Sequence, residues 1–304
     1  MIRSLVQPLA NGSIDIVGDV HGEISALEDL LANLGYGKSG CHPDGRRLVF
    51  VGDLTDRGPD SAAVVDLVKQ LVEAECAQCV LGNHDLNILL GHRKHDNHWF
   101  FGEDSSLGDS AEITPAVLAD DAIRRRVLDF FQTLPLALER DDVRVVHACW
   151  DDEMIERSRQ SSDTRELYHQ YKNQIDEDLL TQPGLDEHDK ELQHQIRNPV
   201  KVLTSGLEVK TDKPFHASGK WRQLERVHWW PDYRARQYCV FGHFSMSPDV
   251  LYTSDQARCV DYGVGKRYAE RQAGKANEFS SKLAALRLPE RVIMFDEGLS
   301  EPID

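Results

Sequence analysis

The stretch "RLVFVGDLTDRGPDS", residues 47–61, joins an apolar run directly to a charged turn. A short apolar run bounded by glycine and proline predicts a buried strand. After it, Val64, Val68 and Leu71 recur at helical spacing. The stretch therefore predicts a strand, a turn and a helix, with Asp53, Asp56 and Arg57 at the carboxyl end of the strand.

The same arrangement recurs along the chain. "IDIVGDV" (14–20) precedes a helical face that begins at Ile24, and "AQCVLGN" (77–83) is a third strand candidate. Further candidates are 143–150, 238–244 and 257–263, and "KLAALRLPERVIMF" (282–295) predicts two strands joined at Leu288-Pro289-Glu290. Strands that alternate with helices predict an α/β protein built on layered sheets.

Polar side chains follow these predicted strands at their ends. In open α/β sheets, ligands bind outside the carboxyl ends of the strands, so we expect the side chains to converge on one rim. Taken strand by strand, they are Asp19 and His21; Asp53, Asp56 and Arg57; Asn83 and His84; His147; and His243.

These residue types predict a metal site. Asp, His and Asn without a thiolate suit divalent ions such as manganese, iron or zinc. Two metal ions would need a bridging carboxylate, and together they could clamp a phosphoryl oxygen. A single buried histidine is more often a hydrogen-bonded core residue than a ligand. The prediction therefore depends on the whole ordered set.

Composition limits the class of protein. The chain has 304 residues, of which 40% are hydrophobic and 28% charged, and neither a membrane span nor a signal peptide is apparent in the sequence. We expect a cytoplasmic protein. The net charge of −16 disfavours stable nucleic-acid binding. The six cysteines are expected to be reduced, and Cys76-x-x-Cys79 has no second pair that would indicate a zinc site.

Two polar segments interrupt the alternation, at 91–130 and 151–225. Long connections in compact domains are usually functional or disordered, so both are expected to be cap insertions. We expect residues 1–304 to form a single domain.

The ordered motifs D-x-H-G, G-D-x-x-D-R-G, G-N-H-D, V-H and G-H resemble those of the calcineurin-like metallophosphoesterases. Specifically, the sequence looks like the phosphoprotein phosphatase branch together with the related symmetrical diadenosine tetraphosphatases, over roughly 14–150 and 236–265. The resemblance implies a layered α/β/β/α sandwich with helical cap insertions. "GHFS" has one histidine where many nucleases of the superfamily have G-H-x-H, which disfavours a nuclease.

The resemblance also implies roles for individual residues. His84 would be the general acid, Asp56 the carboxylate that orients it, and Arg57 a phosphate ligand. Two divalent ions are implied, with Mn²⁺ favoured and Fe or Zn open. Their ligands would be Asp19 and His21 for the first, Asn83, His147 and His243 for the second, and Asp53 as the bridge.

Several residues keep two interpretations. Arg222 is the candidate for a second phosphate arginine, with Arg226 as the alternative. Asp261 is expected to brace the site, and Lys266 could contact substrate or only solvent. The tryptophans of the second insertion could stack on a base, although packing of the cap is favoured. They are Trp221, Trp229 and Trp230.

The function predicted is hydrolysis of phosphate monoesters, in phosphoproteins or small molecules, by direct attack of a metal-bridging hydroxide. The alternative is a dinucleoside polyphosphate hydrolase of the diadenosine tetraphosphate type. An inactive metal-binding scaffold is disfavoured because His84, Asp56 and Asp53 are all present. The partner expected is a phosphorylated substrate, and the oligomeric state stays open.

Overall fold

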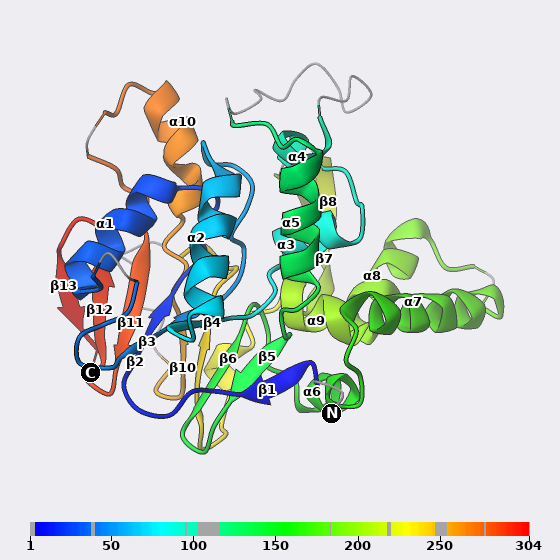
Figure 1. The fold of residues 1–304 in the computed structure, drawn as a ribbon. Coiled ribbons are helices and arrows are strands. Elements are labelled where there is room, and N and C mark those ends of the chain that lie inside the picture. Colours follow the sequence, from blue (N-terminus) through cyan, green and yellow to red (C-terminus); the bar gives the residue numbers. More distant parts are fainter. Residues whose placement is uncertain are drawn as a thin grey trace.

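The computed structural model describes residues 4–37, 40–94, 96–102, 116–182, 184–217, 220–246, 254–276 and 278–303, without the side chains of 216, 217 and 220–222. Two β-sheets stack at its centre (Figure 1). The first sheet has six strands in the order β13-β12-β11-β2-β3-β4. Their bounds are β2 (Ile14–Val17), β3 (Arg47–Phe50), β4 (Ala77–Cys79), β11 (Ala284–Leu288), β12 (Val292–Phe295) and β13 (Ser300–Pro302).

The second sheet has five strands in the order β1-β5-β6-β9-β10. Their bounds are β1 (Val6–Pro8), β5 (Ala137–Glu139), β6 (Val143–Val146), β9 (Tyr238–Phe241) and β10 (Ala257–Cys259). Alternate side chains of both sheets meet in the layer between them: Ile14 and Ile16 from β2, and Val49 from β3, pack in one cluster with Val145 and Val240 of the other sheet. This layer fixes the strand ends relative to each other.

Helices cover the outer face of the six-stranded sheet. α1 (Ile24–Leu34) and α2 (Ser61–Glu73) pack there through apolar faces of helical spacing, including Leu27, Leu30 and Val68. At the start of α2, the carboxylate of Asp60 accepts a hydrogen bond from the Ala63 N–H (2.9 Å). The prediction of layered α/β sheets is confirmed.

One buried ion cluster lies within the six-stranded sheet. Asp15, on the opposite face of β2 from Ile14 and Ile16, is fully buried and contacts Arg46 (2.8 Å) and Arg287 (2.9 Å). Tyr36 donates a hydrogen bond to the same carboxylate (2.8 Å). The buried charge is therefore fully paired.

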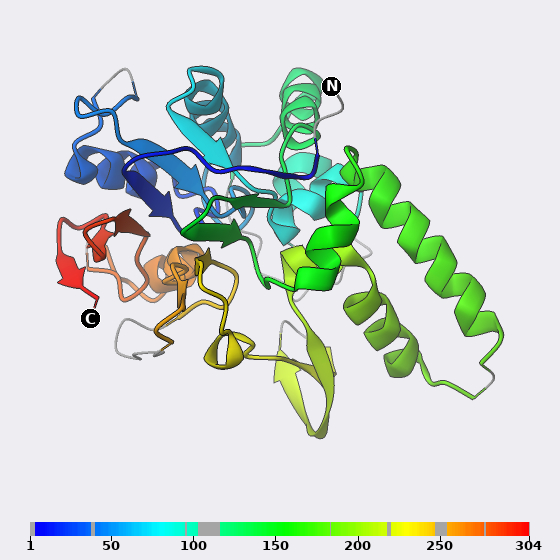
Figure 2. The same ribbon diagram turned by 90° about the horizontal axis from the view of Figure 1, so that it is seen from below.

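The two insertions form the side of the molecule beyond the sheets. The first contains α4 (His98–Phe101) and α5 (Asp121–Phe131), and α3 (Asn83–Leu89) precedes it. The second contains α6 (Asp152–Arg159), α7 (Thr164–Leu180), α8 (Glu187–Arg197) and α9 (Pro199–Ser205). Figures 1 and 2 show α7 and α8 projecting away from the sandwich.

The second insertion is not helical throughout, so the prediction of helical insertions is wrong at its end. Residues 208–226 form a hairpin of β7 (Glu208–Ala217) and β8 (Lys220–Arg226), with a register shift between Lys210 and Phe215. The hairpin makes a separate two-stranded sheet. Its polar, exposed strands lack the apolar alternation that identifies a strand in sequence.

The cysteine prediction is wrong for one pair, because Cys41 and Cys76 form a disulfide. They are 35 residues apart in sequence but their Cα atoms are 5.3 Å apart, since the loop after α1 returns to the turn before β4. The other four cysteines are free and buried.

The remaining elements lie near the chain's end: η2 (Trp230–Asp232), η3 (Val264–Lys266) and α10 (Arg267–Gln272). The predicted strands at 282–295 are confirmed, because β11 and β12 pair antiparallel on either side of Pro289. Among the described residues, no helix combines the length and apolar character needed to cross a membrane.

Candidate metal centre

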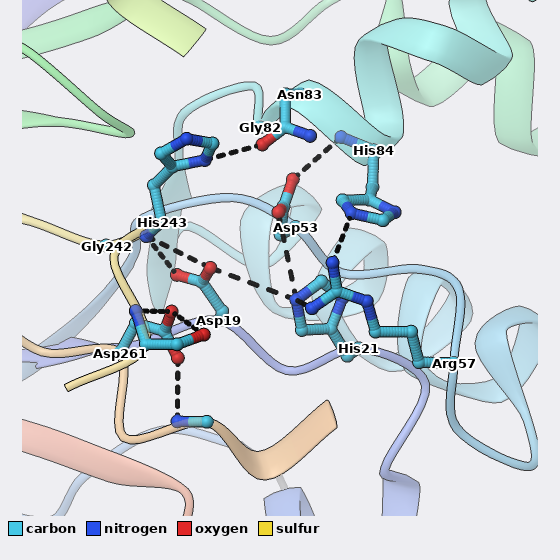
Figure 3. Close-up of polar contacts among 12 residues, drawn as sticks. Asp19, His21, Asp53, Arg57, Gly82, Asn83, His84, Gly242, His243 and Asp261 are labelled. Atoms are coloured by element: carbon cyan, nitrogen blue, oxygen red, sulfur yellow. Dashed lines mark hydrogen bonds and ion pairs between the residues drawn. The ribbon is translucent and has the colours of Figure 1, made fainter. Parts of the chain in front are cut away.

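The site lies in turns at the ends of strands from both sheets (Figure 3). Five non-glycine residues there have positive φ, the left-handed region that L-residues rarely adopt. They are His21 (48°), Asp53 (49°), Asp56 (72°), Arg57 (68°) and His243 (70°). Such strain gathers at functional sites, where the surrounding structure holds it in place.

Two glycines allow the turns to approach each other. An ideal Cβ on Gly82 would lie 2.1 Å from the Asp53 nitrogen, and one on Gly242 would lie 2.0 Å from Asp19 Oδ1. Real Cβ atoms essentially never come that close to another heavy atom. The side chains of the site can converge only because these two positions carry no side chain.

The first half of the site contains Asp19, His21 and Asp53, each almost completely buried. His21 Nδ1 donates to the Thr55 carbonyl (3.0 Å), which leaves the lone pair of Nε2 facing inward. That Nε2 lies 3.9 Å from Asp19 Oδ2 and 3.8 Å from Asp53 Oδ2. The three groups can hold a cation between them.

The second half contains Asn83, His147 and His243. His147 Nδ1 donates to the Val51 carbonyl (2.7 Å), so Nε2 faces the site, 3.4 Å from Asp53 Oδ2. Burial lowers the pKa of His147, but the Asp53 carboxylate outweighs it and raises the pKa to about 9, so a cation at Nε2 would replace a proton. Asn83 Oδ1 lies 3.1 Å from His147 Nε2 and 2.7 Å from His243 Nδ1. Turning the Asn83 amide over would let its nitrogen donate to both rings, whereas the orientation with Oδ1 toward the rings is the one that could bind a cation.

The donor set fits two divalent cations. Groups of ligand atoms within 4.8 Å of one another include His21, Asp53 and His84, and also Asp53, His147 and His243. Asp53 belongs to both, as a bridging carboxylate must. Ligands at about 2.1 Å from a metal lie about 3 Å apart when at right angles, close to the spacing of His147 and Asp53.

The charges of the site are poorly balanced by protein groups alone. Burial and the Asp261 carboxylate raise the pKa of Asp19 well above its ordinary value. Burial would also raise the pKa of Asp53, but His147 and His84 hold it well below its ordinary value. Burial lowers the pKa of His21, and the charge of Arg57 lowers it further. Buried carboxylates beside the neutral imidazole of His21 form an environment that a metal cation stabilises.

A histidine–carboxylate pair adjoins the first half. His84 Nδ1 donates to Asp56 Oδ2 (2.7 Å), and both groups are buried. The indole of Trp99 donates to Asp56 Oδ1 (2.7 Å), so both carboxylate oxygens are fixed. Burial and Arg57 lower the pKa of His84, but the carboxylates of Asp53, Asp96 and Asp56 outweigh them and raise it. This environment favours an imidazole that carries a proton.

Two arginines flank the site. Arg57 Nη1 and Nη2 donate to His21 Nε2 (3.0 Å) and His84 Nε2 (2.9 Å). On the other side, Arg226 is exposed, and its Nη1 donates to the carbonyl of His243 (3.2 Å). The side chain of Arg222, the preferred candidate from sequence, lies outside the described residues. The described contacts therefore place the alternative, Arg226, at the site.

The other candidates lie as follows. Asp261 accepts hydrogen bonds from Ser245 N (2.6 Å) and Gly263 N (2.8 Å), which are contacts of a brace. Lys266 is exposed in η3, and its side chain lies over Gly263.

Of the three tryptophans considered from sequence, Trp229 and Trp230 lie in the core, and the side chain of Trp221 is not described. Trp229 and Trp230 are buried, and Trp229 donates to the Ala148 carbonyl (2.8 Å). Trp230 packs on Phe241 with ring centroids 5.1 Å apart. The side chain of Trp221 lies outside the described residues. The two described tryptophans therefore have the packing role.

Trp99 and Asp96 were not found by sequence reasoning. Both lie in "HDNHWFF", a polar and aromatic stretch without strand or helix periodicity. Asp96 Oδ2 lies 3.6 Å from Arg57 Nε and 3.5 Å from His84 Nδ1. The first insertion thus contributes directly to the site instead of only covering it.

The match to a known family agrees with this site. Residues 12–244 match the family described as calcineurin-like phosphoesterase. The chain belongs to that family and is a metallophosphoesterase.

Individual relatives are more distant. The chain is 33% identical over 171 residues to the asymmetrical bis(5'-nucleosyl)-tetraphosphatase PrpE of Oceanobacillus iheyensis, covering 54% of this chain and 66% of that protein. It is 37% identical over 163 residues to the protein of the same name from Geobacillus sp. (strain WCH70), covering 51% and 64%. The matched region thus spans less than two thirds of either relative.

A solved structure, the cold-active protein-tyrosine phosphatase of a psychrophilic Shewanella sp., has a TM-score of 0.53 at 15% identity. The match covers 100% of this chain and 83% of that one. At this identity, the likeness concerns the fold alone.

Proposed function

We propose that this protein is a dinuclear metal-dependent phosphatase that hydrolyses phosphate monoesters. The observation that carries the proposal is the position of the His84–Asp56 pair and Arg57 at a rim where two His/Asp clusters share Asp53, one of them including His84 itself. A proton donor, a phosphate ligand and a cation site thus occupy one rim. Together these groups can activate a water, neutralise phosphoryl charge and protonate the leaving oxygen.

The metal ligands proposed are Asp19 and His21 on one side, Asn83, His147 and His243 on the other, and Asp53 between them. When bound, two divalent cations such as Mn²⁺ supply an activated water and neutralise phosphoryl charge. Fe and Zn remain alternatives, because the same ligands suit them.

The protein's own residues then bind the phosphate and deliver a proton. Arg57 directs Nη1 and Nη2 to His21 and His84, and Arg226 contacts the backbone of His243, so a phosphate bound near both would meet two guanidinium groups. His84 Nε2 lies 2.9 Å from Arg57 Nη2, so both atoms adjoin the proposed phosphate site. A protonated His84 can donate from Nε2 to the leaving oxygen while Asp56 fixes the ring through Nδ1. Direct hydrolysis of this kind needs no covalent phosphoenzyme.

A second candidate function is hydrolysis of dinucleoside polyphosphates. It is favoured by the curated relatives, which are named as bis(5'-nucleosyl)-tetraphosphatases. The described tryptophans are buried and offer no platform for a base, so the monoesterase remains our first proposal. Both functions would use the same metal ligands, but they differ in the leaving group and in the phosphorus attacked, which has one bridging oxygen in a monoester and two in a dinucleoside polyphosphate.

Product analysis distinguishes them. The Mn²⁺-loaded protein is incubated in parallel with an aryl phosphate, a phosphothreonine peptide and diadenosine tetraphosphate. Release of inorganic phosphate from the first two, with the dinucleotide intact, supports the monoesterase. A much higher kcat/KM for the dinucleotide refutes it in favour of the second candidate. In that case, ADP alone indicates symmetrical cleavage, whereas ATP with AMP indicates asymmetrical cleavage.

A further inference from the structure

Asp96 is held in a fixed position beside the catalytic site. Its side chain is only 12% exposed. The turn that carries it is tied by the buried Asn97, which donates to the His92 carbonyl (3.0 Å) and accepts from Lys94 N (2.9 Å). Two residues further on, Trp99 is anchored on Asp56. The position of the Asp96 carboxylate is thus set by contacts on both sides of it.

The guanidinium of Arg57 is contacted along each of its edges. Nη1 and Nη2 point to His21 and His84, where a phosphate would lie, and Nε lies 3.6 Å from Asp96 Oδ2. The side chain of Arg57 is 37% exposed. Without a contact at Nε, a long and partly exposed side chain would be free to rotate toward solvent.

Bound metal ions make an anchor at Nε more important. His21 Nε2, which accepts from Arg57 Nη1 in this structure, is also a proposed metal ligand, and one lone pair cannot serve both. A divalent cation at that position also repels the guanidinium. The carboxylate of Asp96 attracts the guanidinium and lies outside the proposed ligand set.

We propose that Asp96 is a positioning residue, which holds Arg57 by its Nε edge so that both terminal nitrogens stay in the phosphate site. The inference rests on the proposed function, because it assigns phosphate binding to Arg57. It adds to that function a group from the first insertion that acts on substrate affinity through Arg57. The same Asp96 oxygen also lies 3.5 Å from His84 Nδ1, so any effect on kcat is a separate contribution.

The test compares Asp96→Asn, Asp96→Glu and Asp129→Asn with the wild type. Asp129 is exposed on α5, so its variant removes the same charge away from the site. Calorimetry measures the Kd of inorganic phosphate for each Mn²⁺-loaded protein, and steady-state kinetics on an aryl phosphate give KM and kcat. Metal content and thermal unfolding are recorded to exclude loss of metal or of fold.

We expect Asp96→Asn to raise the phosphate Kd and KM about fivefold, the effect of one lost, partly exposed ion pair, with kcat changed less than about threefold. Asp96→Glu should recover most of the loss, and Asp129→Asn should match the wild type. In an Arg57→Ala background, Asp96→Asn should have no further effect, because its partner is gone.

Three results would overturn the inference while leaving the proposed function intact: an unchanged Kd in Asp96→Asn, a loss confined to kcat, or an equal effect in the Arg57→Ala background. A wild-type protein that neither hydrolyses the ester nor binds phosphate would overturn both.

Discussion

A methyl group on Gly242 is the smallest change that tests the metal centre. Gly242 follows β9, and its N–H donates to the His147 carbonyl (2.8 Å). Its φ is not in the left-handed region, so alanine meets no backbone strain there. The difficulty is space alone, because the new Cβ would lie 2.0 Å from Asp19 Oδ1 and 2.7 Å from Val51 Cγ2.

The size of the effect follows from that overlap. Contacts below 3.0 Å are essentially never seen for real Cβ atoms, so Asp19 or the Gly242 backbone must move by about 1 Å. Asp19 also accepts hydrogen bonds from His243 N (3.2 and 3.1 Å), so the movement reaches a second proposed ligand. We expect Gly242→Ala to bind Mn²⁺ about 10–100-fold more weakly, as when the surroundings of a metal ligand are disturbed. Overpacking should reduce the free energy of unfolding by about 1–3 kcal/mol.

The assay is metal content after dialysis against a series of buffered Mn²⁺ concentrations, with urea unfolding measured in chelator. Gly37→Ala is the matched control, because its Cβ would meet only the Cys41 carbonyl at 3.9 Å. If Gly242→Ala keeps two Mn²⁺ per chain at wild-type affinity, Asp19 is not a ligand in the position described, and the assignment of the first metal fails.

Three further substitutions test other parts of the structure. Trp99→Phe removes the hydrogen-bond donor to Asp56, and the loss of a hydrogen bond to a charged group costs about 1.5–3 kcal/mol. We therefore expect kcat to fall about 10–100-fold with metal content unchanged. An unchanged kcat would contradict the role of Trp99. His84→Asn should cut turnover of an alkyl phosphate about 100-fold or more but that of an activated aryl phosphate far less, and equal losses would refute the general acid. Burial raises the pKa of Asp15, but the hydrogen bonds from Arg46 and other neighbours bring it below the ordinary 3.8. Its contribution to stability is therefore complete above pH 3.8 and lost as the pH falls through the lower folded value. In urea unfolding at several pH values, Asp15→Asn should lose about 3–5 kcal/mol at neutral pH and show a flatter acid limb than the wild type.

The ligand-bearing part of the site was accessible from sequence because it repeats one local rule. Each group follows an apolar run, as Asp53 follows "RLVFV" and His243 follows "YCVF", and the ends of neighbouring strands meet in space. The structure brings together all the residues chosen on this basis. The hydrophobic pattern is thus sufficient to place side chains at a common edge.

The parts that sequence missed depend on contacts without a periodic signal. Trp99 contacts Asp56, and Asp96 contacts Arg57, from an irregular turn. Nothing in the sequence "HDNHWFF" indicates either contact. The choice between Arg222 and Arg226 depended on how a hairpin is oriented, and the stretch was expected to be helical. Long-range geometry decides these assignments, whereas local patterns decide the strand ends.

The backbone of the site adopts conformations that local residue preferences do not predict. Left-handed conformations normally select glycine or asparagine, yet His21, Asp53 and His243 adopt them. Each costs about 1 kcal/mol or more, and the conformations persist because the turns tie each other: Val20 N and His21 N both donate to the Asp53 carbonyl (3.0 and 2.9 Å). Glycine at these positions would relieve the strain but remove a proposed metal ligand. The stability of the stacked sheets therefore offsets the strain at the proposed ligands. If these residues bind metal as proposed, metal affinity should depend on the rigidity of the layer between the sheets as well as on the ligands themselves.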